Sequence, residues 1–321
     1  MALLFSRLAA LGLPKGAGLS VTALKPMPIW LLWTFLALLC WGLWAVLSKL
    51  LGSALSAEQS QALSTLGLLP ILIPLAWSAR GSLRGISRRG LGLALLGGIV
   101  TCLGNVAYYD ALGRGEKVVA VVSLTALYPL VTVVLAVIIL RERLNRVQLA
   151  GLVVSLAAMW LFNIQEGGGL LSRTVAFAVL PIVFWGASGF FQKLATNHLT
   201  AKTAALAYLG AFVPVGIFYA LREPWPESVT LGTWSIVLAL GFFLALGNVA
   251  VLVAFWRGGK AAVIAPLGSL YPLVSVPIAV FLLHEKIGVR EAAGIFCALM
   301  SVAALSWESA PPKSEPAKTK L

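Results

Sequence analysis

Long apolar runs separated by short polar breaks fill most of the chain. A helix needs about 20 residues to cross the hydrocarbon core of a bilayer, and most of these runs have roughly that length. A segment that contacts lipid must satisfy its own backbone hydrogen bonds, so helix is the expected state of each run. We therefore predict ten transmembrane helices, over residues 29–50, 59–77, 91–112, 118–140, 147–164, 174–194, 204–221, 231–256, 261–283 and 292–307.

The glycine and polar positions within the runs show an internal duplication. The segment Gly104–Gly151 recurs without a gap as Gly247–Gly294, and nearly half of the paired positions are identical. Both copies contain Gly-Asn-Val-Ala, Arg-Gly-x-Lys and Leu-Tyr-Pro-Leu-Val in that order. Matching residues also recur upstream: Trp41, Gly42 and Lys49 in the first copy, and Trp185, Gly186 and Lys193 in the second. We predict a first five-helix repeat over 29–164 and a second over 174–307, an arrangement typical of secondary transporters.

Composition and charge placement add the cellular setting. A mean hydropathy of +0.96 with 60% hydrophobic residues lies far outside the range of soluble domains. The net charge of +13 reports orientation rather than a nucleic-acid partner, because with the N-terminus inside most Lys and Arg residues fall on the cytoplasmic face. Five helices is an odd number, so the second repeat enters the membrane inverted relative to the first, and both termini are cytoplasmic. The fold class is all-α and integral to the membrane, with ten transmembrane helices as two inverted five-helix repeats.

This arrangement resembles the EamA family of the drug/metabolite transporter superfamily. The resemblance covers about residues 30–307 and rests on two features of each half. The first is Trp-Gly with Lys in the first helix, and the second is a Tyr-Pro helix followed by Glu-Arg or Glu-Lys and an Ala-Gly-containing helix. It implies a helical carrier, without bound cofactor, whose central cavity is walled chiefly by the first, third and fourth helices of each half. Family members mostly export amino acids or other small metabolites, and relatives carry phosphorylated sugars or nucleotide sugars.

Polar residues inside the predicted spans are the candidates for a substrate site. Asn105 and Asn248 occupy equivalent mid-helix positions, where an amide needs either a substrate or a neighbouring helix as its partner. Asp110 either binds a substrate ammonium or a coupling proton, or pairs with Arg114 one turn away. The other candidates for the cavity are aromatic: Trp41, Tyr108, Tyr128, Trp185 and Tyr271.

Two equivalent lysines and two equivalent prolines also lie in the spans. Lys49 and Lys193 lie near helix ends, where a long side chain reaches the interface, or else they share a role in gating or anion attraction. Pro129 and Pro272 follow tyrosines in mid-helix and remove a backbone donor, so both helices should be kinked there. Each kink is then either a hinge or a packing feature.

The ends of the chain differ from the spans. Residues 1–28 form a basic leader that is disordered or interfacial, or else a cleaved signal or transit peptide. The tail over 308–321 is rich in Pro, Lys and Ser and is expected to be disordered. The three cysteines have no metal-ligand spacing, so we expect no metal site and no cofactor. We predict a location in the cytoplasmic (inner) membrane of a bacterium.

Two classes of function fit the sequence. The first is a secondary carrier that rocks its halves around a midplane site, works as a monomer or homodimer, and exports amino acids or similar small polar molecules. A proton or substrate exchange would drive it, with the lipid bilayer and the substrate as its expected partners. Phosphorylated sugars or nucleotide sugars are the alternative cargo, although they require basic groups deep in the cavity. The second class is a membrane enzyme acting on lipid-linked groups, for which no convergent catalytic cluster is visible. A channel, or a transport subunit that needs a partner protein, also stays open.

Overall fold

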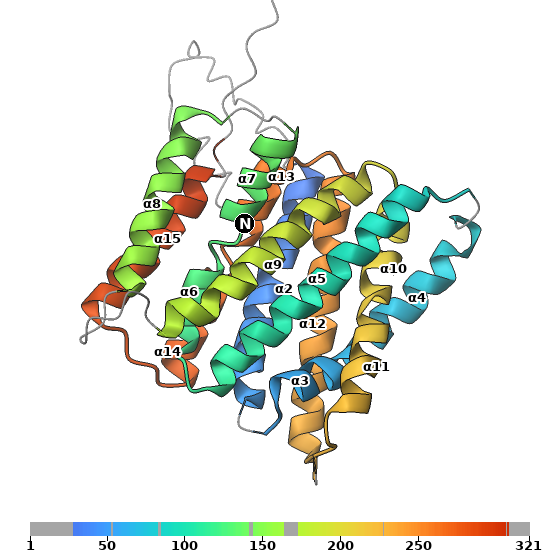
Figure 1. The fold of residues 1–321 in the computed structure, drawn as a ribbon, viewed down its shortest axis with the longest axis horizontal. Coiled ribbons are helices and arrows are strands. Elements are labelled where there is room, and N and C mark those ends of the chain that lie inside the picture. Colours follow the sequence, from blue (N-terminus) through green and yellow to red (C-terminus); the bar gives the residue numbers. More distant parts are fainter. Residues whose placement is uncertain are drawn as a thin grey trace, which may run out of the picture.

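In a computed structural model, the residues that are described form helices joined by short loops and no β-strand (Figure 1). These residues are 28–52, 54–82, 85–140, 144–163, 173–226, 228–305 and 307. Nearly all of the predicted leader, and the predicted tail, lie outside these ranges.

The two repeats contain equivalent α-helices in the same order, and among the described residues the first repeat has two short 3-10 helices, η1 and η2, in addition. The first comprises α2 (Ile29–Leu51), α3 (Ala57–Ser64), η1 (Thr65–Leu68), α4 (Leu69–Ala79), η2 (Arg80–Ser82), α5 (Arg88–Gly113), α6 (Val118–Thr125), α7 (Pro129–Leu140) and α8 (Arg146–Asn163). The second comprises α9 (Arg173–Thr196), α10 (Ala201–Gly210), α11 (Phe212–Arg222), α12 (Leu231–Trp256), α13 (Ala261–Gly268), α14 (Pro272–Leu282) and α15 (Val289–Leu305).

The described residues include eight helical spans that are long and apolar enough to cross a membrane. Four are single or nearly unbroken helices (α2, α5, α9 and α12), and four are interrupted (α3–α4, α6–α7, α10–α11 and α13–α14). The predicted fifth and tenth spans correspond to α8 and α15, which pack against each other at one edge (Figure 1). Both are shorter or less apolar than the other eight, so their passage through the membrane stays a prediction.

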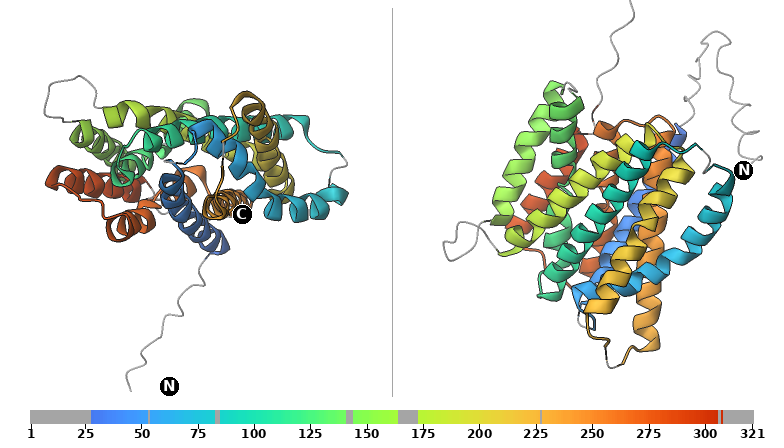
Figure 2. Two further views of the ribbon diagram at one scale, coloured as in Figure 1. Left: turned by 90° about the horizontal axis from the view of Figure 1, so that it is seen from below. Right: turned by 45° about the vertical axis from the view of Figure 1, so that its right-hand side comes forward.

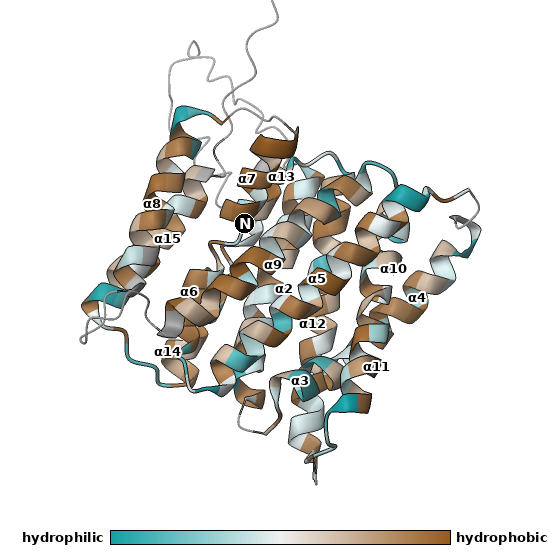
Figure 3. Ribbon diagram, in the orientation of Figure 1, coloured by the Kyte–Doolittle hydropathy of each residue, from teal (hydrophilic) through white to brown (hydrophobic). Residues whose placement is uncertain are grey.

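Apolar side chains cover the outside of the bundle. Figure 3 shows hydrophobic residues along the helices and hydrophilic ones gathered at helix ends and loops. Large apolar side chains such as Ile138 and Phe281 are 69% and 80% exposed. An apolar surface of this extent is unfavourable in water and favourable against lipid.

The predicted kinks at the two Tyr-Pro positions are confirmed. Helix α6 ends at Thr125 and α7 begins at Pro129, while α13 ends at Gly268 and α14 begins at Pro272. A proline suits the first turn of a helix, because the amide proton that it lacks would have no partner there. In the connecting turns, backbone hydrogen bonds span three residues instead of four, such as the one from the Tyr128 amide to the Thr125 carbonyl at 3.0 Å.

The halves pack reciprocally. Helix α2 packs along α12, and α9 packs along α5, so the first helix of each half lies against the third helix of the other. Seen from below, the helices form two layers, with α2 and α12 in one layer and α5 and α9 in the other (Figure 2). A Cβ atom at Gly104 would lie 2.5 Å from the ring of Trp185, and one at Gly247 would lie 2.7 Å from the ring of Trp41. Both pairs therefore need glycine, and the same close contact is built twice.

Candidate functional site

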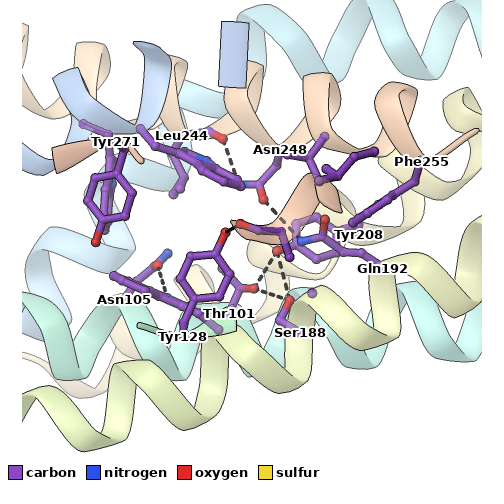
Figure 4. Close-up of a pocket in the computed structure, with 17 residues that line it drawn as sticks. Thr101, Asn105, Tyr128, Ser188, Gln192, Tyr208, Leu244, Asn248, Phe255 and Tyr271 are labelled. Atoms are coloured by element: carbon purple, nitrogen blue, oxygen red, sulfur yellow. Dashed lines mark hydrogen bonds between the residues drawn. The ribbon is translucent and has the colours of Figure 1, made fainter. Parts of the chain in front are cut away.

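A cavity lies between the two halves, at the level where α2, α5, α9 and α12 meet (Figure 4). The empty space amounts to about 610 Å³, part of it open to solvent. All of the side chains around it are uncharged. They are Trp41, Trp44, Thr101, Asn105, Tyr128, Trp185, Ser188, Gly189, Gln192, Tyr208, Leu244, Asn248, Val251, Phe255, Ile264, Ala265 and Tyr271.

Hydroxyl groups form one polar wall of the cavity. The Thr101 hydroxyl lies 2.6 Å from that of Ser188 and 2.5 Å from that of Tyr208. Ser188 also lies 3.2 Å from the Tyr208 hydroxyl and donates to the Gly97 carbonyl at 2.9 Å. These groups satisfy one another and hold α5, α9 and α10 together, so this wall is rigid.

Two amide side chains predicted for the site lie on the cavity, in different surroundings. Asn105 accepts a hydrogen bond through Oδ1 from the indole N–H of Trp185 at 3.1 Å. Asn248 donates to the Leu244 carbonyl at 2.8 Å and accepts a long bond of 3.5 Å from Gln192. Both residues are buried. Each amide therefore lines the cavity and also bonds to protein, and its role in substrate binding stays a prediction.

The two tyrosines predicted from the Tyr-Pro motif also line the cavity, and their bonds mirror each other. The Tyr128 hydroxyl donates to the Ala265 carbonyl at 3.3 Å, and the Tyr271 hydroxyl donates to the Val122 carbonyl at 3.2 Å. Each tyrosine thus bonds the broken helix of the other half. Tyr271 has an additional contact of 2.7 Å to the Thr125 hydroxyl. Pro129 and Pro272 follow these tyrosines directly, at the start of α7 and α14.

An aromatic cluster closes one end of the cavity. Trp44 stacks on Tyr108 with ring centroids 4.9 Å apart and meets Trp185 edge-on at 5.5 Å. The Trp44 indole N–H donates to the Tyr109 hydroxyl at 3.1 Å. Tyr108 is fully buried behind Trp44, and its hydroxyl bonds the Ala45 carbonyl at 3.4 Å. The structure therefore places Tyr108 behind the cavity wall, and Trp44 occupies the position on the wall.

The cavity extends in only one direction from this cluster. It follows α9 and α12 toward their C-terminal ends, as the lining residues Gln192, Phe255 and Ile264 show. We call this the Lys193 end of the bundle, and the opposite one, at the C-terminal ends of α2 and α5, the Lys49 end. The repeat explains the difference, because the equivalents of Trp44, Tyr108 and Tyr109 in the second half are small or aliphatic: Ser188, Val251 and Leu252.

Contacts between the halves also brace the Lys49 end. The carboxylate of Glu285 accepts hydrogen bonds from the amides of Val118 and Val119, both at 2.9 Å, and so caps the first turn of α6. Lys117 forms an ion pair with Glu291 at 2.8 Å. Glu285, the acidic residue of the repeated Glu-Lys pair, thus bonds backbone amides of the other half. Glu142, its equivalent, lies outside the described residues.

Asp110 does not line the cavity. Its carboxylate accepts a hydrogen bond from Arg114 at 2.7 Å, and the two side chains are 40% and 51% exposed. This is the i,i+4 ion pair that the sequence analysis left as the alternative. The carboxylate raises the pKa of the Arg114 guanidinium, chiefly through this hydrogen bond.

The equivalent lysines make equivalent backbone contacts. Lys49 donates to the carbonyls of Glu116 at 2.9 Å and Leu112 at 3.3 Å. Lys193 donates to the carbonyl of Gly259, the counterpart of Glu116, at 3.2 Å, and its ammonium lies 5.9 Å from the ring centroid of Phe255. Both cations therefore stabilise the C-terminal end of a third helix. Neither lysine lines the cavity.

Sequence reasoning missed several residues of the site: Trp44, Ser188, Gln192, Tyr208 and Phe255. Gln192 could have been predicted from the sequence, since it is an amide side chain within a predicted span. The remaining residues look like ordinary apolar or small positions in a single sequence. The described residues bring together no group of three or more His, Cys, Asp or Glu that could hold a metal ion.

Comparison with known proteins gives the family. The chain matches the EamA-like transporter family over residues 28–164 and again over 172–307. It is 25% identical over 223 residues to the uncharacterized transporter YojE of Bacillus subtilis, a match that covers 67% of this chain and 70% of YojE. It is 31% identical over 137 residues to the uncharacterized protein MJ1333.1 of Methanocaldococcus jannaschii, which covers 42% of this chain and 98% of the archaeal protein.

A solved crystal structure has the same fold. Its TM-score is 0.60 at 19% sequence identity, over 85% of this chain and 94% of the other. The family match extends over both halves, and the helices are apolar enough for a bilayer, so the protein is an integral membrane transporter of small molecules. The chain belongs to the EamA-like transporter family.

Proposed function

We propose that the protein is a secondary transporter for small polar molecules without net charge, amino acids and similar compounds first among them. We further propose that it exports them by alternating access around the cavity between its repeats. The observation that carries this proposal is the uncharged cavity, which lies between the halves and extends toward one end only.

The lining favours this cargo over phosphorylated compounds. A buried phosphate needs cationic partners, usually Arg or Lys, and none of the side chains on the cavity is charged. Hydroxyl and amide groups suit the polar atoms of a zwitterion or a neutral molecule. The aromatic rings of Trp41, Trp185, Tyr128 and Tyr271 suit its apolar surface and, for a zwitterion, its ammonium group.

The arrangement of the halves supports alternating access. Reciprocal contacts such as the two tyrosine bonds give the repeats equivalent interfaces, which a rocking motion exchanges. The breaks before Pro129 and Pro272 offer hinges in both halves. With the N-terminus in the cytoplasm and the second repeat inverted, the Lys193 end faces the cytoplasm. The cavity then extends toward the side from which an exporter binds its substrate. A proton or exchange of substrate would supply the energy.

The alternatives have less support. A carrier for phosphorylated sugars or nucleotide sugars would need cations that the cavity lacks. A membrane enzyme acting on lipid-linked groups would need a convergent acid, base or metal cluster, and neither the cavity nor the other described residues provide one.

Export is tested by comparing metabolites in cells that express the chain. Untargeted mass spectrometry of medium and cytosol should show a compound enriched outside with wild type and lost with Asn105→Ala at equal membrane abundance. Asp110→Asn is the matched control, because this exposed residue of the same helix lies off the cavity. The purified protein in liposomes should then show saturable counterflow of that compound. Failure of both assays would contradict the proposal.

A further inference from the structure

Two polar atoms on the cavity wall have no hydrogen-bond partner in the protein. They are Nδ2 of Asn105 and Oε1 of Gln192, on residues that are only 0% and 5% exposed. A buried amide atom without a partner carries a desolvation cost, and such atoms are rare in folded proteins. Both residues line the cavity, where a ligand can reach them (Figure 4).

The orientation of the Asn105 amide is fixed by its neighbour. An indole N–H can only donate, so the atom of Asn105 that lies 3.1 Å from Trp185 Nε1 must be the oxygen. The remaining atom, Nδ2, is therefore the one without a partner, and it is a donor.

The orientation of the Gln192 amide is fixed in two steps. The Leu244 carbonyl can only accept, so Asn248 presents its Nδ2 to that carbonyl and keeps its Oδ1 for Gln192. Because this oxygen can only accept, Gln192 must present its Nε2 to it. The atom of Gln192 without a partner is therefore Oε1, an acceptor.

The two atoms lie at different depths. Asn105 lies beside Trp185, next to the aromatic cluster that closes the Lys49 end. Gln192 lies seven residues further along α9, which corresponds to about 10 Å along a helix axis, toward the Lys193 end. Aromatic rings and uncharged groups separate the two depths.

We infer that Asn105 Nδ2 and Gln192 Oε1 determine the specificity of the cavity. The substrate is then an elongated molecule without net charge that has different polar groups at its two ends. The substrate presents a hydrogen-bond acceptor to Asn105 at the closed end and a donor to Gln192 toward the Lys193 end, with an apolar or aromatic middle. This inference rests on the proposed transport function and refines its substrate class.

Four small probes separate the two contacts. L-Tyrosine has a carboxylate acceptor at one end and a phenol donor at the other. L-Phenylalanine lacks the distal donor, and 4-ethylphenol lacks the acceptor at the other end while staying uncharged. 4-Hydroxyphenylacetamide keeps both groups but is uncharged, so it distinguishes a neutral amide from a zwitterion. Their dissociation constants are measured on purified, reconstituted protein by equilibrium dialysis.

Two near-isosteric variants then identify the atom that each probe contacts. Asn105→Leu should weaken L-tyrosine and L-phenylalanine about tenfold and leave 4-ethylphenol unchanged, since this probe has no acceptor at the end near Asn105. Gln192→Met should weaken L-tyrosine and 4-ethylphenol about tenfold and leave L-phenylalanine unchanged. Gln192→Glu keeps an acceptor at this position and should retain binding of 4-ethylphenol.

Thr196→Val is the matched control. It removes a hydroxyl from the same helix as Gln192, about one turn further along and off the cavity, which bonds only the Lys193 carbonyl of its own helix at 2.8 Å, so the affinity for all four probes should stay unchanged. Thermal melting in detergent confirms that each variant is folded. Variants that weaken every probe to the same extent, or the reverse pairing of variants and probes, would overturn the inference while leaving transport intact. Wild-type protein that exports a metabolite but binds none of the four probes would also overturn the inference and leave the proposed transport function intact. If neither export nor binding is found, the proposed function fails as well.

Discussion

The two ends of the cavity are built by equivalent parts of the two repeats, yet one end is filled and the other is hollow. At the Lys49 end, Trp44 and Tyr108 stack and close the space between α2 and α5. At the Lys193 end, the equivalent residues are Ser188 and Val251, and both line the cavity. A few side chains on a common backbone therefore decide which end of the bundle is closed.

The contacts that recur in both halves differ from the side chains that close the Lys49 end, because they support the scaffold. Lys49 and Lys193 bond equivalent carbonyls, and Tyr128 and Tyr271 bond equivalent broken helices. Such contacts hold the scaffold and recur in both halves. The comparison teaches that the two halves share the frame and part of the wall, while the residues that close the Lys49 end differ at the Lys193 end.

The largest effect is expected from making the hollow end resemble the filled one. Val251→Tyr introduces the counterpart of Tyr108 into the cavity, so transport should fall by more than about tenfold because the substrate space is occupied. Uptake into liposomes measures it. Val253→Tyr, two residues further along α12 and away from the cavity, is the control and should transport normally. Equal transport by both variants would mean that the cavity is not the route.

The converse change should loosen the filled end. Trp44→Ala removes a buried ring that contacts two tyrosines and Trp185, and it should lower the free energy of unfolding by about 3–5 kcal/mol. We also expect a leak of small solutes through the Lys49 end. Thermal melting and passive efflux from liposomes report the two effects. A variant with unchanged melting temperature and no passive efflux would show that other contacts close this end.

A smaller, symmetric effect is expected from the lysines. Lys49→Met and Lys193→Met each remove a bond to the end of a third helix and should lower stability by about 1 kcal/mol, with transport retained. Melting temperatures and initial rates of the two variants are compared side by side. Loss of transport at unchanged stability, in either variant, would instead favour the role in gating or anion attraction.

The smallest effect is expected for Asp110. Its ion pair with Arg114 is exposed, and exposed pairs contribute little. Asp110→Asn should therefore leave melting temperature and transport rate within experimental error. A variant that loses coupling between proton and substrate would restore Asp110 as a functional residue.

The sequence predicted the helices, the duplication and the breaks well, because each depends on local patterns. Apolar length marks a span, and Pro129 and Pro272 mark an interruption. The wall of the cavity depends on the rotation of each helix against its neighbours, which a single sequence does not record. Tyr108 was therefore predicted on the wall, whereas Trp44 lies there and Tyr108 lies behind it.

Equivalence between the repeats predicted wall residues that both halves contribute, and it could not predict those that differ between the halves. Asn105 and Asn248 are equivalent and both line the cavity, yet only Asn105 has an unpaired atom. The difference comes from the Leu244 carbonyl, which accepts a hydrogen bond from Nδ2 of Asn248, whereas Nδ2 of Asn105 has no such partner. Such a difference becomes visible only when the partner of each amide is known.

The reciprocal packing also has a consequence for assembly. Each first helix packs mainly against the third helix of the other half and much less against its own half. A protein of one repeat, about the length of the archaeal relative, would need a second copy to cover its first helix, and its folding would depend on concentration. Joining the repeats in one chain replaces this encounter by an intramolecular one at high effective concentration and fixes the stoichiometry. It also frees each half to acquire its own side chains, which two identical copies never can.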